Sequence, residues 1–258
     1  MKKLYFFTLL FIVIITCSFA QFNETISSDR PGKSIGPFTV GQGIFQIQSG
    51  VDNFGNQNSD IRIKERGFIN NNVLRYGLTE LFEISSQIEY KSEVINQNGS
   101  KNSLHGWSAI DVGMRYHIYT GKGIVPNVGF QIRWRIPRVG GDFEIEQWAP
   151  RFIFVTSQSL SNKVTLVTNW GGSWNGNNNV PSGNYTFSLI YSINNKIGLF
   201  IENYGTLTKS DFDMYLDGGL TYLINNHLQF DIYTGYGANK KLNEYFVSMG
   251  ISWRTNRK

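Results

Sequence analysis

The sequence has 258 residues, of which 41% are hydrophobic, 17% charged and 15% aromatic. Its net charge of +5 at pH 7 comes from 24 basic and 19 acidic residues spread along the chain, which argues against a nucleic-acid-binding protein. After residue 20 no apolar run is long enough for a membrane-spanning helix, although the aromatic content exceeds what a polar soluble domain needs.

Residues 1–20 have the three parts of a secretory signal peptide. Two lysines follow the initiating methionine, Leu4–Thr16 is apolar, and Ser18-Phe19-Ala20 is a small-x-small cleavage site. We therefore predict cleavage near Ala20 and a single domain over residues 21–258. A permanent anchor is the weaker interpretation, because about 13 apolar residues are too few to span a bilayer. Removal of the two lysines leaves 22 basic against 19 acidic residues, a net charge of +3.

Cys17 is the only cysteine of the chain. A lipid anchor at Cys17 is an alternative to simple cleavage, but Thr16 ahead of the cysteine fits a lipobox poorly. Either route exports the protein. If Cys17 leaves with the signal peptide, the mature chain forms no disulfide and no thiolate metal site.

The segment Asp29-Arg30-Pro31 precedes the first predicted strand. Pro31 lacks a backbone donor and favours an extended or turn conformation. The segment could fold into the barrel as a small gate, contact a periplasmic partner, or form a turn that closes the floor of the barrel. The closing turn is the interpretation we favour from sequence.

Twelve segments between turn-rich stretches are predicted to be strands. Five of them alternate apolar and polar residues most clearly: Phe82–Tyr90, Ile110–Ile118, Val128–Ile136, Leu228–Tyr236 and Tyr245–Trp253. The other seven are Gly43–Val51, Asn72–Leu78, Phe152–Leu160, Val164–Gly172, Tyr185–Ile193, Ile197–Tyr204 and Phe212–Leu223.

The connections between these segments alternate in length along the chain. The predicted tight turns are Leu78–Glu80, Thr120–Gly123, Ser161–Lys163, Asn194–Lys196 and Asn225–His227. The predicted long loops are Asp52–Arg66, Lys91–Gly106, Pro137–Ala149, Trp174–Asn184, Gly205–Ser210 and Gly237–Leu242. Short turns at one end and long loops at the other are typical of an antiparallel up-and-down transmembrane β-barrel of the bacterial outer membrane. An even strand number places both termini in the periplasm.

The long apolar and aromatic faces of the strands are expected to face lipid, since exposed in water they would promote aggregation. The polar faces then line the interior, and the barrel must close because an open sheet edge is not tolerated in hydrocarbon. Candidate lumen-lining residues are Glu83, Glu89, Asp111, Arg115, Arg133, Arg135, Asp213, Asp217 and Asp231, with Arg75 and Glu202 as further members.

Two interpretations of these charges have equal weight. In the first they set the selectivity of an open channel, and in the second they pair in a salt-bridged plug that fills the barrel. Twelve strands lie between the filled interior of eight-stranded barrels and the aqueous channel of sixteen-stranded ones. We expect Arg115, Arg133 and Arg135 to cluster on one side of the lumen. Opposite them we expect an acidic patch of Asp213, Asp217 and Asp231.

Three motifs resemble those of one outer-membrane barrel family. They are Asp29-Arg30-Pro31, the Gly-x-x-Gln-x-x-x-Gly pattern over Gly43–Gly50, and Arg75-Tyr76-Gly77-Leu78-Thr79. The chain resembles, from about Ser27 to Trp253, the family labelled "putative meta-pathway of phenol degradation". Gln48 departs from the pattern, where relatives often carry Glu. The resemblance implies a transporter-like barrel for small solutes, with aromatic compounds as a candidate class.

Catalytic chemistry has little support in the sequence. His117 is the one histidine on a predicted strand, and Ser85, Ser188 and Ser192 are its candidate partners for a barrel lipid hydrolase. The chain lacks a Gly-x-Ser-x-Gly motif and any spacing typical of metal ligands. We predict no enzyme activity, no metal and no cofactor.

The sequence therefore predicts a channel for the passive passage of small solutes in the outer membrane of a Gram-negative bacterium. The expected partners are outer-membrane lipid, a small-molecule solute and the barrel-assembly machinery, and no nucleic acid. The alternative is a barrel without transport that serves as an envelope-structural or surface-binding protein. Substrate and oligomeric state stay open.

Overall fold

The computed structural model describes residues 24–58, 62–209, 211–238 and 243–257. The expected signal peptide, its cleavage site and Cys17 lie outside these residues. Within the described chain, no helix is both long and apolar enough to cross a bilayer. One short 3-10 helix, η1 (Gly141–Phe143), interrupts the connection between the fifth and sixth strands.

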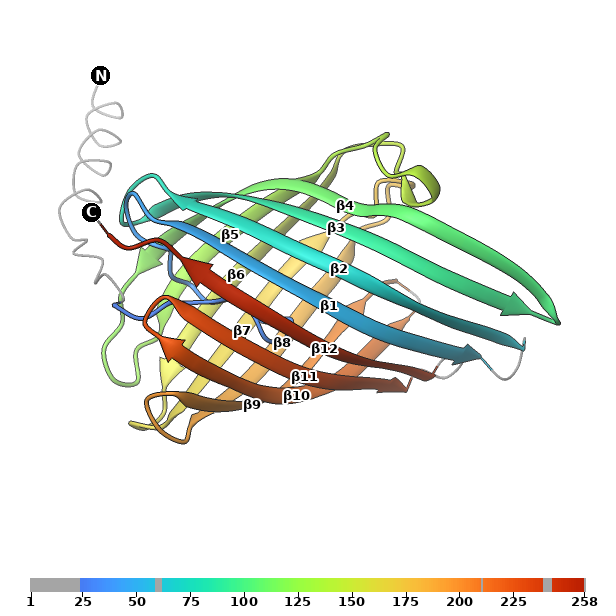
Figure 1. Cartoon of the computed structure of the whole chain (residues 1–258). Coiled ribbons are helices and arrows are strands. Elements are labelled where there is room, and N and C mark those ends of the chain that lie inside the picture. The colour runs from blue at the N-terminus through green and yellow to red at the C-terminus, as the bar shows by residue number, and fades with distance from the viewer. Residues whose placement is uncertain (1–23, 59–61, 210, 239–242, 258) are drawn as a thin grey trace, which may run out of the picture.

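Twelve antiparallel strands of the described residues form one closed barrel in chain order, and the first strand pairs with the last (Figure 1). The strands are β1 (Phe45–Asn58), β2 (Ile63–Gly77), β3 (Phe82–Gln97), β4 (Ser100–Tyr119), β5 (Asn127–Arg135), β6 (Ala149–Ser159), β7 (Val164–Ser173), β8 (Ser182–Ser192), β9 (Ile197–Leu207), β10 (Phe212–Asn225), β11 (Leu228–Ala238) and β12 (Asn243–Arg254). The predicted all-β, up-and-down fold with about twelve strands is therefore confirmed.

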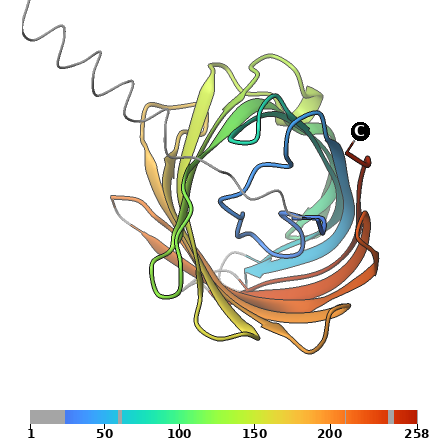
Figure 2. The same ribbon diagram turned by 90° about the vertical axis from the view of Figure 1, so that its left-hand side faces the viewer.

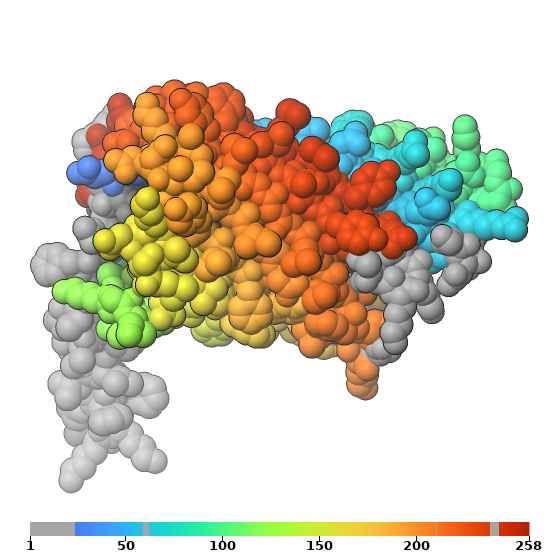
Figure 3. Space-filling model, turned by 90° about the horizontal axis from the view of Figure 1, so that it is seen from below, coloured from blue at the N-terminus to red at the C-terminus, as the bar shows by residue number. Residues whose placement is uncertain are grey.

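Apolar side chains cover the outside of the barrel and polar ones fill much of its inside. On β12, Val247, Met249 and Ile251 are exposed, whereas Ser248 and Ser252 are fully buried. Figure 3 shows the outer wall over the later strands as a continuous surface of side chains. This distribution is the reverse of a water-soluble protein and matches a barrel whose outer surface faces lipid.

Three predicted long loops are wrong: the first half of Gly205–Ser210 belongs to β9, which ends at Leu207, and the other two lie further toward the N-terminus. Most of Asp52–Arg66 belongs to β1 and β2, and nearly all of Lys91–Gly106 belongs to β3 and β4, which Asn98 and Gly99 join in a tight turn. These strands extend well past their neighbours (Figure 1). Their outer parts mix polar residues with scattered apolar ones such as Phe68, Val94 and Trp107, so they lack the regular alternation of a lipid-facing strand. The backbone ladder continues because it does not depend on side-chain type. The longest described connection is 136–148, between β5 and β6.

The N-terminal segment, residues 24–44, lies inside the barrel and not beneath it (Figure 2). It forms no strand, and its Ile26, Val40 and Ile44 side chains are buried. The closing turn that the sequence favoured is therefore wrong, and the segment occupies the interior. It does so because its backbone amides and carbonyls find polar side chains of the barrel wall as partners.

Candidate functional site in the barrel interior

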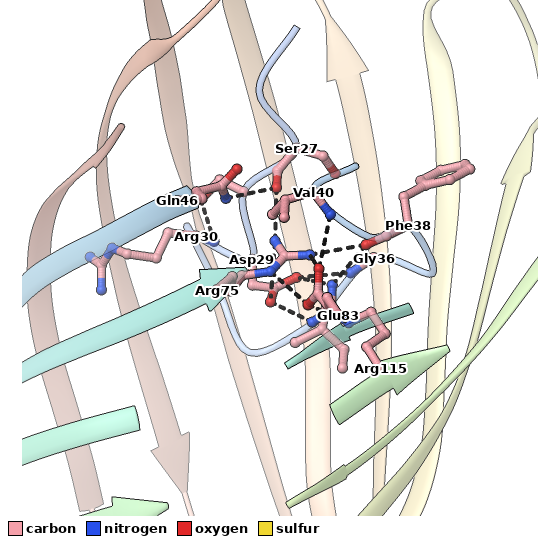
Figure 4. Close-up of polar contacts among 12 residues, drawn as sticks. Ser27, Asp29, Arg30, Gly36, Phe38, Val40, Gln46, Arg75, Glu83 and Arg115 are labelled. Carbon is pink, nitrogen blue, oxygen red and sulfur yellow. Dashed lines mark hydrogen bonds and ion pairs between the residues drawn. The ribbon is translucent and has the colours of Figure 1, made fainter. Parts of the chain in front are cut away.

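A network of four charged side chains holds the N-terminal segment against β2, β3 and β4 (Figure 4). Arg115 Nη2 lies 2.5 Å from Asp29 Oδ2, and Arg75 Nη1 lies 3.8 Å from the same oxygen. Arg75 also donates from Nε and Nη2 to the two oxygens of Glu83, at 2.8 and 2.9 Å. Two arginines and two carboxylates thus balance one another, and all four side chains are at least 91% buried.

The Asp29 carboxyl is held in its charged form. Burial alone would raise its pKa, but the guanidinium groups of Arg115 and Arg75 outweigh burial and hold the pKa of Asp29 well below its usual range. A charged Asp29 keeps its ion pairs at every pH near neutrality.

The same network also binds the backbone of the segment at two places. Arg75 donates from Nη1 to the Ser27 carbonyl and from Nη2 to the Phe38 carbonyl, at 2.9 and 3.0 Å. The Val40 amide donates to Glu83 Oε2 at 2.9 Å. The chain between Ser27 and Val40 is therefore a loop whose two ends are fixed at one point of the wall.

Arg30 anchors the segment to the strands that close the barrel, and its side chain points away from the Asp29 network (Figure 4). It donates to Asp231 from Nη2 at 2.9 Å and from Nε at 3.3 Å, and to Ser248 Oγ at 2.9 Å. Burial alone would lower the pKa of Arg30, but Asp231 more than offsets this and raises it. Arg30 is therefore a permanent cation with a two-point contact to its carboxylate.

The space for the Arg30 guanidinium comes from two glycines. Gly50 on β1 and Gly250 on β12 are direct cross-strand partners. A Cβ atom at either position would overlap the guanidinium of Arg30. The closure of the barrel and the placement of the segment thus depend on the same glycine pair.

A third set of contacts holds the middle of the segment against β7 and β9. Glu202 accepts hydrogen bonds from the amides of Lys33 and Ser34, at 2.6 and 3.0 Å. Asn169 bonds both backbone groups of Ile35, at 2.8 Å to the amide and 3.0 Å to the carbonyl. The segment therefore touches opposite regions of the wall and crosses the interior.

The predicted lumen charges divide into three groups in the structure. Those that contact the segment are Arg75, Glu83, Arg115, Glu202 and Asp231. Those bound to other parts of the barrel are Glu89, which accepts from Asn71 and Ser108, Arg135, which donates to the Phe143 carbonyl, and Asp213, which accepts from Thr206. The third group is also buried: Asp111 lies 3.9 Å from Arg151, Arg133 donates to Gln87, and Asp217 completes the group. That these side chains line a solute path stays a prediction.

The three arginines expected to cluster, Arg115, Arg133 and Arg135, lie on the adjacent strands β4 and β5, but each binds a different partner. Arg115 is bound to Asp29, and Arg135 is bound to the β5–β6 connection. The neighbour of Arg133 is Arg151, which lies directly opposite it on β6. The expected acidic patch does not stand free either, because Asp231 is bound to Arg30.

Sequence reasoning missed Arg151, Asn169 and Gln87. Arg151 precedes the predicted strand Phe152–Leu160 by one residue, so a strand start one residue earlier would have included it, and β6 in fact starts at Ala149. Arg151 lies on the same strand face as the apolar Ile153, so the alternation of this segment did not mark that face as polar. The strand pattern placed Asn169 and Gln87 on polar faces. It gave no reason to choose these amide side chains as site residues over the other polar residues of the same faces.

Three cavities lined by described residues lie around the N-terminal segment inside the barrel. The terminal-end cavity, of about 280 Å³, lies near the barrel end that holds the C-terminus, the middle cavity has about 250 Å³, and the loop-end cavity about 310 Å³. The terminal-end and middle cavities share Arg30 and Ile35 in their linings. The middle and loop-end cavities share Lys33, Asp52 and Ile69. The cavities therefore follow one another along the barrel, separated by residues of the segment.

The environment of His117 does not assemble the proposed hydrolase pair. Its Nδ1 lies 3.2 Å from the Pro37 carbonyl oxygen and its Nε2 lies 2.8 Å from Thr120 Oγ1. The ring also stacks on Phe38. Both nitrogens are thus engaged by the segment and the adjacent turn, and none of the three candidate serines is a partner in the described structure. The described residues also contain no group of three or more His, Cys, Asp or Glu side chains that could hold a metal ion.

Comparison with known proteins gives a family and a fold. The family model described as "Putative MetA-pathway of phenol degradation" matches residues 28–255. Comparison with curated protein sequences gives no match.

Several solved structures share the barrel at low sequence identity. An outer-membrane channel from Pseudomonas putida F1 has 11% identity and a TM-score of 0.67, and the match covers 88% of this chain and 99% of that one. The translocator domain of the autotransporter NalP from Neisseria meningitidis has 12% identity and a TM-score of 0.56 over 83% of this chain and 89% of that one. The KdgM porin has 9% identity and a TM-score of 0.54 over 81% and 99%. At these identities the likeness establishes the fold, which channels, porins and translocator domains have in common.

Proposed function

Because the chain belongs to the family described as "Putative MetA-pathway of phenol degradation", we propose that it is an outer-membrane channel for the passive passage of small solutes. The solutes include small aromatic compounds, as the family description suggests. Residues 1–20 act as a signal peptide that is removed near Ala20, the barrel-assembly machinery inserts the mature chain, and the apolar outer surface contacts outer-membrane lipid.

The observation that carries this proposal is the series of three cavities along the barrel. Their linings share residues of the N-terminal segment, so a solute would move from one cavity to the next past Lys33, Ile35 and Arg30. Because the segment separates the cavities, it would restrict passage to small molecules. The polar walls replace part of the hydration of a passing solute.

One feature favours a second candidate, a barrel that conducts nothing and supports the envelope. The Asp29 and Arg30 ion pairs hold the segment firmly across the interior. If the segment does not move, the cavities stay separate and the segment is a structural plug.

Conductance measurements in planar bilayers decide between the two candidates. For a channel we expect the complete mature protein to show small, stable conductance steps, and a variant without residues 24–40 to show steps several-fold larger. For a sealed barrel, the complete protein conducts nothing and only the shortened variant conducts. Silence from both variants, with the barrel still heat-modifiable on gels, would refute the channel proposal.

A further inference from the structure

Two arginines face each other across the β5–β6 ladder without a matching pair of carboxylates. Arg133 and Arg151 are direct cross-strand partners, and like charges in that position destabilise a sheet unless something compensates them. Arg133 is 95% buried, whereas the Arg151 side chain is 41% exposed. Arg133 is thus fixed by burial, whereas the Arg151 side chain is accessible from the barrel interior.

The groups that contact this pair supply little negative charge. Gln87 Oε1 accepts from Arg133 Nη1 at 2.5 Å and from Arg151 Nη2 at 3.5 Å, so a neutral amide oxygen lies between the two cations. Asp111 Oδ2 is 3.9 Å from Arg151 Nη2, and Asp111 Oδ1 has no partner among the described residues. Arg133 Nε also has none.

The remaining carboxylates nearby are used elsewhere or lie on another strand. Asp29 is bound by Arg115 and Arg75, and Glu89 accepts from Asn71 and Ser108. Asp52 enters the same cavity from β1. Asp29, Asp52 and Glu89 all line this cavity, but they share it with Arg30 and Lys33 as well as the arginine pair, so the four cations of its described lining outnumber the three carboxylates and the pair is only partly neutralised.

Both arginines line the middle cavity, which combines this charge with an apolar wall. Ile35 of the N-terminal segment, Val73 and Ile153 line it as well. Gln48 and Gln131 also line it, and both carry side-chain amide atoms that are buried without a partner. About 250 Å³ lies just below the ~300–1,000 Å³ typical of drug-sized ligands, so the cavity suits a small molecule.

We propose that the middle cavity binds a small carboxylate with an apolar body, with its carboxylate on Arg133 and Arg151. A planar guanidinium group matches a carboxylate with two parallel hydrogen bonds, and the ligand carboxylate would supply the negative charge that the neutral Gln87 lacks. The apolar part of the ligand would pack against Ile35 and Ile153. The inference rests on the proposed channel function and names the solute class that the channel would select.

Titration calorimetry on the mature protein in detergent micelles tests the site with two probes of equal shape, benzoate and its uncharged analogue benzamide. We expect benzoate to bind at least about tenfold more tightly than benzamide, because a charge-assisted contact is lost in the amide. The double variant Arg133→Gln, Arg151→Gln should lose about tenfold or more in benzoate affinity and little in benzamide affinity. Arg135→Gln is the matched control, since Arg135 lies on the same strand face but outside the cavity, and it should stay within about twofold.

Equal affinity for the two probes, or unchanged benzoate binding in the double variant, would overturn the proposal. If the double variant does not fold, Arg151→Gln alone decides, because its side chain is partly exposed, and it should weaken benzoate binding by about threefold or more. Swelling of proteoliposomes in arabinose separates this inference from the channel function. Arabinose entry without benzoate binding would refute the carboxylate site and support the channel. Benzoate binding at the arginines without any solute entry would support the site and refute the channel.

Discussion

Two pairs of arginines inside the same barrel have opposite electrostatic environments. Arg75 and Arg115 face two carboxylates, Asp29 and Glu83, at distances of 2.5 to 3.8 Å. Arg133 and Arg151 share the amide oxygen of Gln87, and Arg151 also lies 3.9 Å from the carboxylate of Asp111.

Buried charge in one lumen can therefore serve two purposes. A complete set of ion pairs stabilises structure and leaves nothing for a ligand, because removing one partner exposes an uncompensated buried charge. An incomplete set costs some stability and leaves charge that a solute can neutralise. The first pair belongs to the anchor of the N-terminal segment, and the second to the cavity beside it.

The largest effect is expected when the complete set is broken. Glu83→Ala would leave Arg75 and Arg115 with Asp29 alone, and it would remove the acceptor of the Val40 amide. We expect the free energy of unfolding to fall by about 3–5 kcal/mol, as for other broken buried pairs. Urea titration in lipid vesicles, followed by heat-modifiability on gels, measures it. A loss below about 1 kcal/mol would show that the network does not stabilise the barrel.

A smaller effect is expected from filling the space that Arg30 occupies. Gly250→Val would place side-chain atoms on the guanidinium and displace Arg30 from Asp231. We expect the free energy of unfolding to fall by about 1–3 kcal/mol, as for other overpacked positions. Conductance should rise because the N-terminal segment is no longer anchored by Arg30. Gly183→Ala on β8 is the control, since a Cβ there meets only ordinary contacts. Unchanged conductance in Gly250→Val would contradict the anchoring role of Arg30.

The incomplete pair should respond in the opposite direction. Arg151→Gln removes one of two like charges that stand directly opposite each other, so the free energy of unfolding should rise by about 0.2–1 kcal/mol. The same urea titration measures this change. A loss above 1 kcal/mol would mean that Arg151 belongs to a stabilising network, as Arg75 does.

The smallest effect concerns pH. The pKa of Asp29 lies below its usual range, so its ion pairs contribute stability above the unfolded carboxyl pKa of ~3.9, and that stability is lost only as pH falls through the lower folded pKa. Conductance should therefore not change through release of Asp29 between pH 4.5 and pH 7.5, roughly the range above that unfolded value. An opening transition centred between pH 5 and pH 7 that disappears in Asp29→Asn would contradict this.

The sequence alone was enough to predict a twelve-stranded barrel with apolar residues outside, because period-two alternation is a local property of each strand. Val128–Ile136 and Tyr245–Trp253 carry that signal almost without interruption, and both are strands in the structure. The prediction of loops failed where strands continue beyond the apolar band, as in the β3–β4 hairpin, since a strand in water needs no apolar face.

Only the tertiary structure decided which charges meet. Asp29 and Arg115 are 86 residues apart, and Arg30 and Asp231 are 201 residues apart, so no pattern along the chain could pair them. These contacts depend on the path of residues 24–44, which have no regular structure, and on the register in which β1 meets β12. The family motif Asp29-Arg30-Pro31 marked the segment in the sequence, but its place inside the barrel follows from buried carboxylates and arginines on strands far from it. Long-range ion pairs are set by barrel closure, and strand alternation is set by neighbours two residues away.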